Sequence, residues 1–147
     1  MPTKKPSGTP SAASSSSKPP ERLTLFLDES LDSDSISRAL TEAGAAVERL
    51  TAHLPKGTTD EVWLSLAGKN GWVVLTRDKR IRYRRLERLA LQAAKVRAFV
   101  FTGGNVTIDE TGAILARALI HITRICAGEP GPFVYHIGAA GKPRRMD

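Results

Sequence analysis

The sequence predicts an α/β protein, a three-layer α/β/α sandwich with a mostly parallel central sheet. Short apolar runs rich in β-branched and aromatic residues alternate along the chain with segments of helical periodicity. Strands that are separated by helices pair in parallel through right-handed crossovers, which place helices on both faces of the sheet. The length of 147 residues, with 41% hydrophobic and 25% charged residues, is appropriate for one hydrophobic core.

The strands are expected at five apolar runs of about five residues each. These runs cover residues 23–27, 46–50, 72–76, 98–102 and 133–137. The run at 72–76 is continuously apolar, which is typical of a strand buried on both faces of a parallel sheet. The first, third and fourth runs end in polar residues or glycines, so each strand leads directly into a loop.

Helices are expected between these runs, at residues 34–43, 60–70, 81–94 and 108–127. Ser33 or Asp34 can cap the first helix, and Gly44 suits its end. The spacing from Thr58 to Glu61 is that of a capping box at the start of the second helix. The packing face of the third, basic helix is expected to consist of Leu86, Leu89, Ala90 and Ala93.

Two tails flank the predicted domain of residues 22–137. Residues 1–21 are dominated by Ser, Pro, Lys, Thr and Ala without apolar periodicity, and are expected to be disordered. Residues 138–147 are expected to form a second loose, basic tail. No apolar stretch approaches the ~20 residues that span a bilayer. The single cysteine excludes an intramolecular disulfide framework and fits a reducing, cytoplasmic location.

Positive charge is concentrated in one part of the chain. The net charge is +7, and residues 77–97 alone carry nine basic and two acidic side chains. Outside this segment and the tails, the chain is net acidic. A basic band beside an acidic site suits a polyanionic substrate together with a metal ion that reacts with it. A solvated, arginine-rich helix face is the plainer interpretation of the charge run alone.

Acidic residues stand where a parallel sheet binds ligands, beyond the carboxyl ends of its strands. Asp28 and Glu29 follow the first strand, Asp78 follows the third, and Asp60 and Glu61 open a helix. Converging carboxylates repel each other, and a hard divalent ion such as Mg²⁺ or Mn²⁺ relieves the repulsion. Taken one at a time, the same acids also suit a polar loop, a helix cap or a helix dipole. The candidate catalytic residues are Asp28, Asp60 and Asp78, and the candidate metal ligands are these three with Glu29 and Glu61.

The basic residues near Asp78 are placed to bind the phosphates of RNA. The segment is poor in aromatic residues, so base stacking is expected to contribute little. The candidate RNA-binding residues lie at the end of the third strand, in the basic segment or after the fourth strand. They are Thr76, Arg77, Lys79, Arg80, Arg82, Arg84, Arg85 and Asn105.

Three stretches of the sequence resemble the PIN-like nucleases, especially the small group related to VapC-type toxins of toxin–antitoxin systems. They are LTLFLDES (23–30), KGTTDEVWLSLAGKNGWVVLTRDKRIR (56–82) and RAFVFTGGN (97–105). The resemblance implies a PIN-like fold and Mg²⁺- or Mn²⁺-dependent endoribonuclease activity. It also implies a cognate antitoxin as partner and the formation of homodimers, which are common among PIN proteins.

The resemblance carries over to three acids. Asp28 matches the acid after the first strand, Asp60 with its neighbour Glu61 matches the acid that opens a helix, and Asp78 matches the acid after the third strand. Many PIN domains have a fourth acid further along the chain, and this sequence has no clear equivalent. Asn105 or Glu29 are the candidates for that place.

The sequence is therefore interpreted as that of a metal-dependent endoribonuclease, the toxin of a toxin–antitoxin pair. One alternative is a non-catalytic RNA-binding or regulatory module that keeps the fold and the basic band. Another is a receiver-like phosphoacceptor domain, which needs a lysine soon after its last strand. The last predicted strand ends at Ile137, and the first lysine after it is Lys142.

Overall fold

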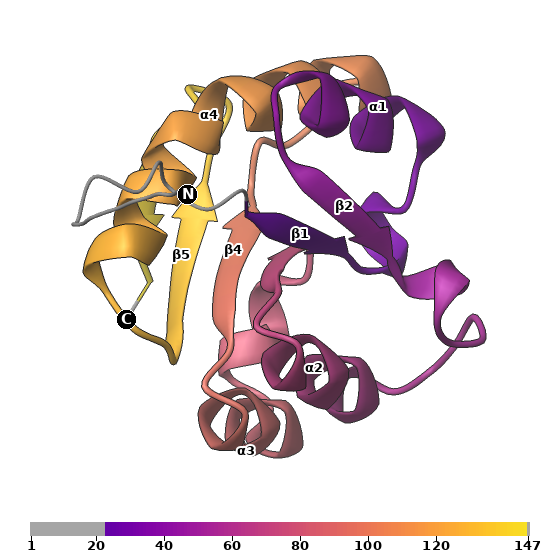
Figure 1. Cartoon of the computed structure of the whole chain (residues 1–147), viewed down its shortest axis with the longest axis vertical. Helices are drawn as coiled ribbons and strands as arrows, with labels where there is room; N and C mark the ends of the chain where they lie inside the picture. The colour runs from indigo at the N-terminus through magenta and orange to yellow at the C-terminus, as the bar shows by residue number, and fades with distance from the viewer. Residues whose placement is uncertain (1–22, 147) are drawn as a thin grey trace, which may run out of the picture.

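The computed structural model describes residues 23–146 and arranges them as a six-stranded sheet between two layers of helices (Figure 1). The strands lie in the order β2-β1-β3-β4-β5-β6, and the first five are parallel, while β6 runs antiparallel to β5. The predicted α/β/α sandwich is confirmed. The strands are β1 (Thr24–Leu27), β2 (Ala46–Arg49), β3 (Val73–Thr76), β4 (Arg97–Phe101), β5 (Phe133–Ile137) and β6 (Pro143–Arg145).

The helices divide between the two faces of the sheet. On one face α1 packs against α4, and on the other α2 packs against α3. Alternate residues of each strand supply the two cores, because successive side chains of a strand point to opposite faces. Leu25 and Leu27 belong to the core under α1 and α4, and Phe26 belongs to the core under α2 and α3. The helices are α1 (Asp34–Glu42), α2 (Asp60–Lys69), α3 (Arg85–Ala93) and α4 (Ile108–Gly128).

Short 3₁₀ turns complete the loops at the carboxyl edge of the sheet. They are η1 (Glu29–Leu31), η2 (Leu50–Ala52) and η3 (Lys79–Arg82). The start of α1 is as predicted, since the Ser33 hydroxyl accepts a hydrogen bond from the backbone of Ile36. The predicted capping box of α2 is wrong: Thr59 is the capping residue, and its side chain makes no capping hydrogen bond. The two acids of the first turn stabilise this helix end through the helix dipole instead.

The predicted packing face of the third helix is wrong for Leu86, Leu89 and Ala93, which are exposed, while Ala90 does pack against the core. Leu86 and Leu89 are 62% and 46% exposed, whereas Glu87 and Leu91 are buried. The buried face is therefore rotated by about one residue, roughly 100° around the helix axis. The physical reason is a buried carboxylate, which an apolar pattern does not reveal. Glu87 lies on the same face of the helix as the buried Leu91, one turn before it, and the guanidinium of Arg84 bonds to it there.

The segment after β5 is ordered. Residues 143–145 form β6 along the edge of the sheet, and Arg145 forms an ion pair with Glu129. The Arg145 guanidinium also lies over the Tyr135 ring, 5.5 Å from its centroid. The prediction of a loose tail after Ile137 is therefore wrong through residue 146. The predicted disorder of residues 1–21 concerns a segment that lies outside the described residues.

The strand order creates a crevice at the carboxyl edge of the sheet. The chain moves from β1 outward to β2 and then crosses to β3 on the other side of β1. Loops after β1 and β3 therefore diverge, which is the arrangement at which parallel sheets bind ligands. The helices α2 and α3 approach most closely at their C-terminal ends, near the opposite edge of the sheet, where a Cβ atom on Gly68 would lie 2.4 Å from that of Ala94. Among the described residues, no helix has the length and apolar character needed to cross a membrane.

Candidate metal centre

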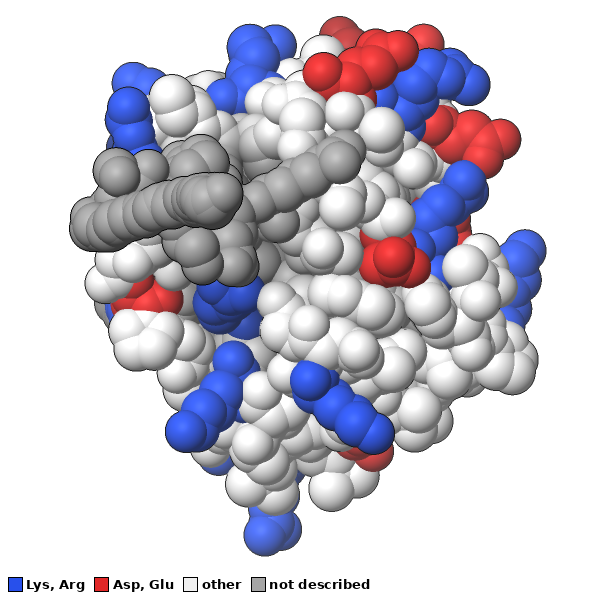
Figure 2. Space-filling view, in the orientation of Figure 1, with Lys and Arg blue, Asp and Glu red and all other residues white. Residues whose placement is uncertain are grey.

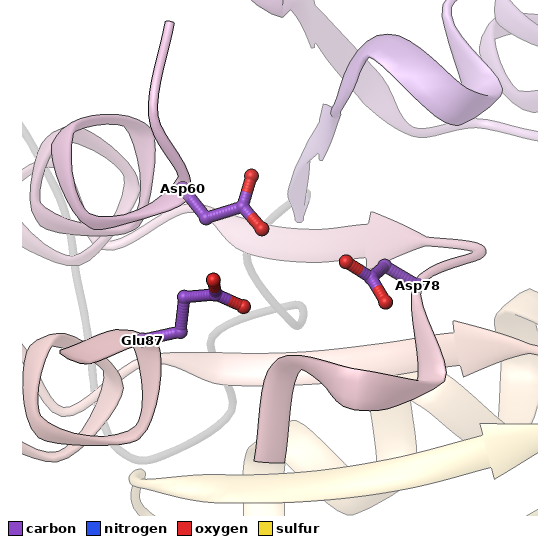
Figure 3. A group of neighbouring side chains, drawn as sticks. All are labelled: Asp60, Asp78 and Glu87. Atoms are coloured by element: carbon purple, nitrogen blue, oxygen red, sulfur yellow. The ribbon is translucent and has the colours of Figure 1, made fainter. Parts of the chain in front are cut away.

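Three carboxylates from separate elements converge at the carboxyl edge of the sheet. Asp60 is the first residue of α2, Asp78 precedes η3, and Glu87 lies in α3. Their nearest oxygens all lie within 4.8 Å of one another. Figure 3 shows the three side chains pointing into the same space from three directions. Asp60 and Asp78, predicted from sequence to converge, do so, whereas Asp28, predicted to join them, is not a member of the group and Glu87 stands in its place.

Asp60 and Asp78 are held in place by local hydrogen bonds. The indole Nε1 of Trp63 donates to the Asp60 carboxylate at 2.8 Å, and Trp63 is itself buried against Phe26 with ring centroids 5.9 Å apart. Asp78 caps η3 by accepting a hydrogen bond from the backbone N–H of Arg80 at 3.0 Å. In each carboxylate the second oxygen, Oδ2, faces the guanidinium of Arg84.

Glu87 is the functional candidate that sequence reasoning missed. It is 8% exposed, and burial raises the pKa of its carboxyl; the Asp60 carboxylate adds to that rise, and hydrogen bonding to Arg84 opposes it. It is the only acid within residues 79–97, a segment that contains eight Arg and Lys residues. The sequence did contain a signal for Glu87, namely a single acid in a basic segment. The position of such a charge needs a structural or chemical reason.

Asp28 lies at the base of the same edge. It is 6% exposed, and its carboxylate accepts hydrogen bonds from the Ser30 hydroxyl and the Thr76 hydroxyl, both at 2.5 Å. Burial raises the pKa of Asp28 to about 6, the charge of Asp60 adds to that rise, and these hydrogen bonds oppose it. The Thr76 hydroxyl also accepts from the backbone N–H of Asp78 at 3.1 Å. Thr76 thus connects two of the predicted acids.

One cation stands among the three converging carboxylates. The Nη1 atom of Arg84 lies 3.2 Å from Asp78, 3.2 Å from Glu87 and 3.7 Å from Asp60. Hydrogen bonding to Glu87 raises the pKa of this guanidinium. One positive charge faces three carboxylates, so the group retains an excess of negative charge when all three are ionised.

The two remaining acids of the predicted ligand set lie elsewhere. Glu29 accepts a hydrogen bond from the backbone N–H of Gly57 at 3.0 Å. Glu61 is partly buried in the first turn of α2. Among the residues that the structure describes, neither belongs to the group of three carboxylates.

The predicted RNA-binding residues fall into two sets. Thr76 cannot contact RNA directly, because its side chain is fully buried in the hydrogen bonds described above. Arg77 bonds to the carbonyl of Gly104 at 3.2 Å and lies over the Phe101 ring. Arg84 lies among the three converging carboxylates, and Arg82 lies in η3. The exposed members are Lys79, Arg80, Arg85 and Asn105.

The donor set fits a hard divalent cation. All three converging side chains offer carboxylate oxygens, which are the ligands that Mg²⁺ and Mn²⁺ prefer. With no histidine or cysteine in the group, the centre does not resemble a zinc site. The charge of Asp60 acts on Asp28, but Asp28 lies outside the group of three converging carboxylates.

The Trp63→Phe substitution is expected to weaken Mn²⁺ binding by about 10-fold with a small loss of stability, since outer partners of ligands typically contribute that much. Phenylalanine keeps the ring stack on Phe26 but cannot donate to Asp60. Isothermal titration of Mn²⁺ into the purified protein measures the effect. The control is Trp72→Phe, because Trp72 stacks on the same Phe26 ring at 5.7 Å. Equal losses in both variants would exclude a positioning role for the indole.

Comparison with known proteins places these residues in a family context. A family model described as "PIN like domain" matches residues 23–103, more than half of the chain. A protein of Mycobacterium tuberculosis strain H37Rv named "Putative ribonuclease VapC45" is 25% identical over 117 residues, which is 77% of this chain and 84% of that protein. No solved structure matches the chain significantly. The family match contains Asp28 and all three converging carboxylates.

Proposed function

The chain belongs to the family of PIN-like domains, and on that premise we propose that it is an endoribonuclease that depends on Mg²⁺ or Mn²⁺. The observation that supports this proposal most directly is the convergence of Asp60, Asp78 and Glu87 at the carboxyl edge of a parallel sheet. Carboxylates drawn from three elements to one point are costly without a cation. The convergence of these carboxylates is explained if the protein is a hydrolase that acts on a polyanion.

In this proposal the acids have distinct roles. Asp60, Asp78 and Glu87 hold the ion, and Asp28, deeper in the protein, limits the positions that it can take. A divalent ion bound here would polarise the scissile phosphoryl group and help to activate a water molecule. Trp63, Ser30 and Thr76 keep the carboxylates in fixed orientations through the hydrogen bonds already described.

The exposed basic residues are proposed to hold the RNA backbone. Lys79 and Arg80 follow Asp78 directly and are exposed, and Arg85 is exposed at the start of α3. On the face drawn in Figure 2, basic side chains lie over the lower part of the molecule, toward α2 and α3, and also along its upper edge, while most of the visible acidic side chains gather near α1. Charges of this kind bind phosphates without reading sequence, so binding is expected to weaken with salt.

The likeness to VapC45 further supports a role as the toxin of a toxin–antitoxin pair. A cognate antitoxin would then bind the protein and block access to the carboxylates. We place the protein in the cytoplasm, where its RNA substrates and such a partner are found, and a homodimer is compatible with the proposal. Co-expression with the product of a neighbouring gene, followed by co-purification, tests the partner.

The Asp78→Asn substitution tests the catalytic proposal. Labelled RNA incubated with the protein and Mn²⁺ is expected to be cleaved, and cleavage is expected to fall by more than ~100-fold in the variant, because the group loses one charged ligand. Asp109→Asn, an exposed acid in the first turn of α4, is the control. Wild-type protein that binds RNA without cleaving it would favour the non-catalytic RNA-binding alternative.

A further inference from the structure

The guanidinium of Arg84 occupies the space that the three carboxylates enclose. Its Nη1 atom is within 3.7 Å of an oxygen from each of Asp60, Asp78 and Glu87. One oxygen from each of the three carboxylates lies within 4.8 Å of the other two, so the nitrogen stands beside the same group of oxygens. A cation already neutralises part of their charge, and that cation belongs to the protein itself.

A divalent ion and this guanidinium compete for the same place. Mg²⁺ binds carboxylate oxygens at about 2.1 Å, and the Arg84 nitrogen lies 3.2 Å from oxygens of Asp78 and Glu87, so an ion bound to those oxygens would lie no more than about 5.3 Å from this nitrogen. Two positive charges at so short a distance repel when they are partly shielded from water. The ion is therefore expected to bind best once the guanidinium has moved away.

We propose that Arg84 is the resident cation of the metal-free centre, and that a divalent ion binds Asp60, Asp78 and Glu87 only by displacing the Arg84 guanidinium. This inference rests on the proposed function, because it assumes that the three carboxylates bind a metal ion. It assigns Arg84 a positioning role in which it holds the three ligands together until the ion arrives and lowers the net affinity of the site for that ion.

The surroundings of Arg84 allow such a displacement. Its side chain is 38% exposed, so a path to solvent exists. Arg84 is the residue that precedes α3, and its backbone is tied into the chain by the hydrogen bonds of its N–H to Arg80 and of its carbonyl to Arg88. The side chain can therefore swing outward by rotation about its own bonds while Glu87 and the helix stay in place.

A permanent structural ion pair is the competing explanation, and the two make opposite predictions. If Arg84 only stabilises the fold, its removal lowers the melting temperature equally with and without metal and leaves metal affinity unchanged or weaker. If Arg84 is displaced, its removal lowers the melting temperature of the metal-free protein only. The same variant then binds the ion more tightly, because no contact has to be broken first.

The test compares Arg84→Gln with Arg85→Gln in the whole protein. Both substitutions remove one positive charge, but Arg85 is exposed and absent from the carboxylate group. Titration calorimetry with Mn²⁺ is expected to show affinity about 10-fold higher for Arg84→Gln and within about 2-fold of wild type for Arg85→Gln. In EDTA the melting temperature of Arg84→Gln should be lower than that of wild type, and saturating Mn²⁺ should remove the difference.

The controls separate this inference from the function on which it rests. Wild-type protein should bind Mn²⁺, and Asp78→Asn should bind it more weakly. If that holds but Arg84→Gln binds Mn²⁺ no more tightly than wild type, displacement is wrong and the metal centre stands. If Asp78→Asn binds as well as wild type, the ion lies elsewhere, and both the proposed centre and the role of Arg84 are overturned.

Discussion

The Asp28→Asn protein is expected to be more stable than the wild type at neutral pH while RNA cleavage falls by more than ~100-fold. Burial raises the pKa of Asp28 from an ordinary value of 3.8 to about 6, even though Ser30 and Thr76 donate hydrogen bonds to it. At pH 7 the wild-type protein therefore holds a buried negative charge that the metal-free fold does not balance. Asparagine has a similar shape and no charge.

The sign and range of the pH effect follow from the two pKa values. Between about pH 4 and 6 the folded wild-type protein binds more protons at Asp28 than the unfolded chain does, so its stability falls as pH rises. Above pH 6 the loss in the free energy of unfolding is constant. It is at most about 3 kcal/mol, at 1.36 kcal/mol per pKa unit. Reorienting one hydroxyl to accept from the new amide group offsets about 1 kcal/mol of that gain.

Urea unfolding in EDTA at pH 4 and pH 7.5 measures this difference. The variant and the wild type should be similar at pH 4, and the variant should be more stable at pH 7.5. Asp32→Asn provides a control of opposite sign. Burial raises the pKa of Asp32, but hydrogen bonds from Thr51 and Arg49 outweigh it, so its net pKa is lowered. That variant should lose stability at pH 7.5. A gain for Asp28→Asn that does not change with pH would show that its buried charge is not the cause.

The Glu87→Gln substitution is expected to weaken Mn²⁺ binding by about 10- to 100-fold and to reduce RNA cleavage by at least as much. Glu87 is buried and its oxygens lie with those of Asp60 and Asp78 within 4.8 Å. Glutamine keeps the size of the side chain but removes the charge that a divalent ion needs. Mn²⁺ titration and the cleavage of labelled RNA, each measured on the same preparation, give the two values.

Glu61→Gln is the matched control for this prediction. Sequence reasoning assigned Glu61 to the ligand set, whereas the geometry assigns Glu87, so the two variants decide between the assignments. Both remove one carboxylate from a helix beside the same crevice. A large loss in Glu61→Gln with little change in Glu87→Gln would favour the sequence-based assignment and remove Glu87 from the centre.

The buried acidic residues at the carboxyl edge lower the stability of the fold, and the proposed function explains their presence. Asp28 and Glu87 are both buried, and burial raises the pKa of each. Buried carboxylates without full compensation destabilise a fold, and such groups concentrate at functional sites. If Arg84 is displaced by the ion, the protein also gives up three ion-pair contacts when it becomes active. The apparent stability of the protein should therefore depend on metal concentration.

The amino-acid sequence by itself determined the order of the elements and the edge of the sheet at which the site lies. Apolar runs separated by helical periods leave few topologies other than a parallel sheet, and Asp28 and Asp78 directly follow two of its strands. Position along the chain is sufficient for these two acids, because the carboxyl ends of parallel strands share one edge. Residues 143–145 were missed because a short basic edge strand has no apolar pattern.

Only the tertiary structure decided that Glu87 joins the centre and that Arg84 lies within it. Which side of α3 faces the protein depends on its rotation about its own axis, and the leucines of that helix indicated the wrong rotation. The rotation is set by close packing on α2 and by the burial of Leu91 in the core, and it brings Glu87 within reach of Arg84. Contacts between residues distant in the sequence have no local periodicity, so their partners become visible only once the chain is folded.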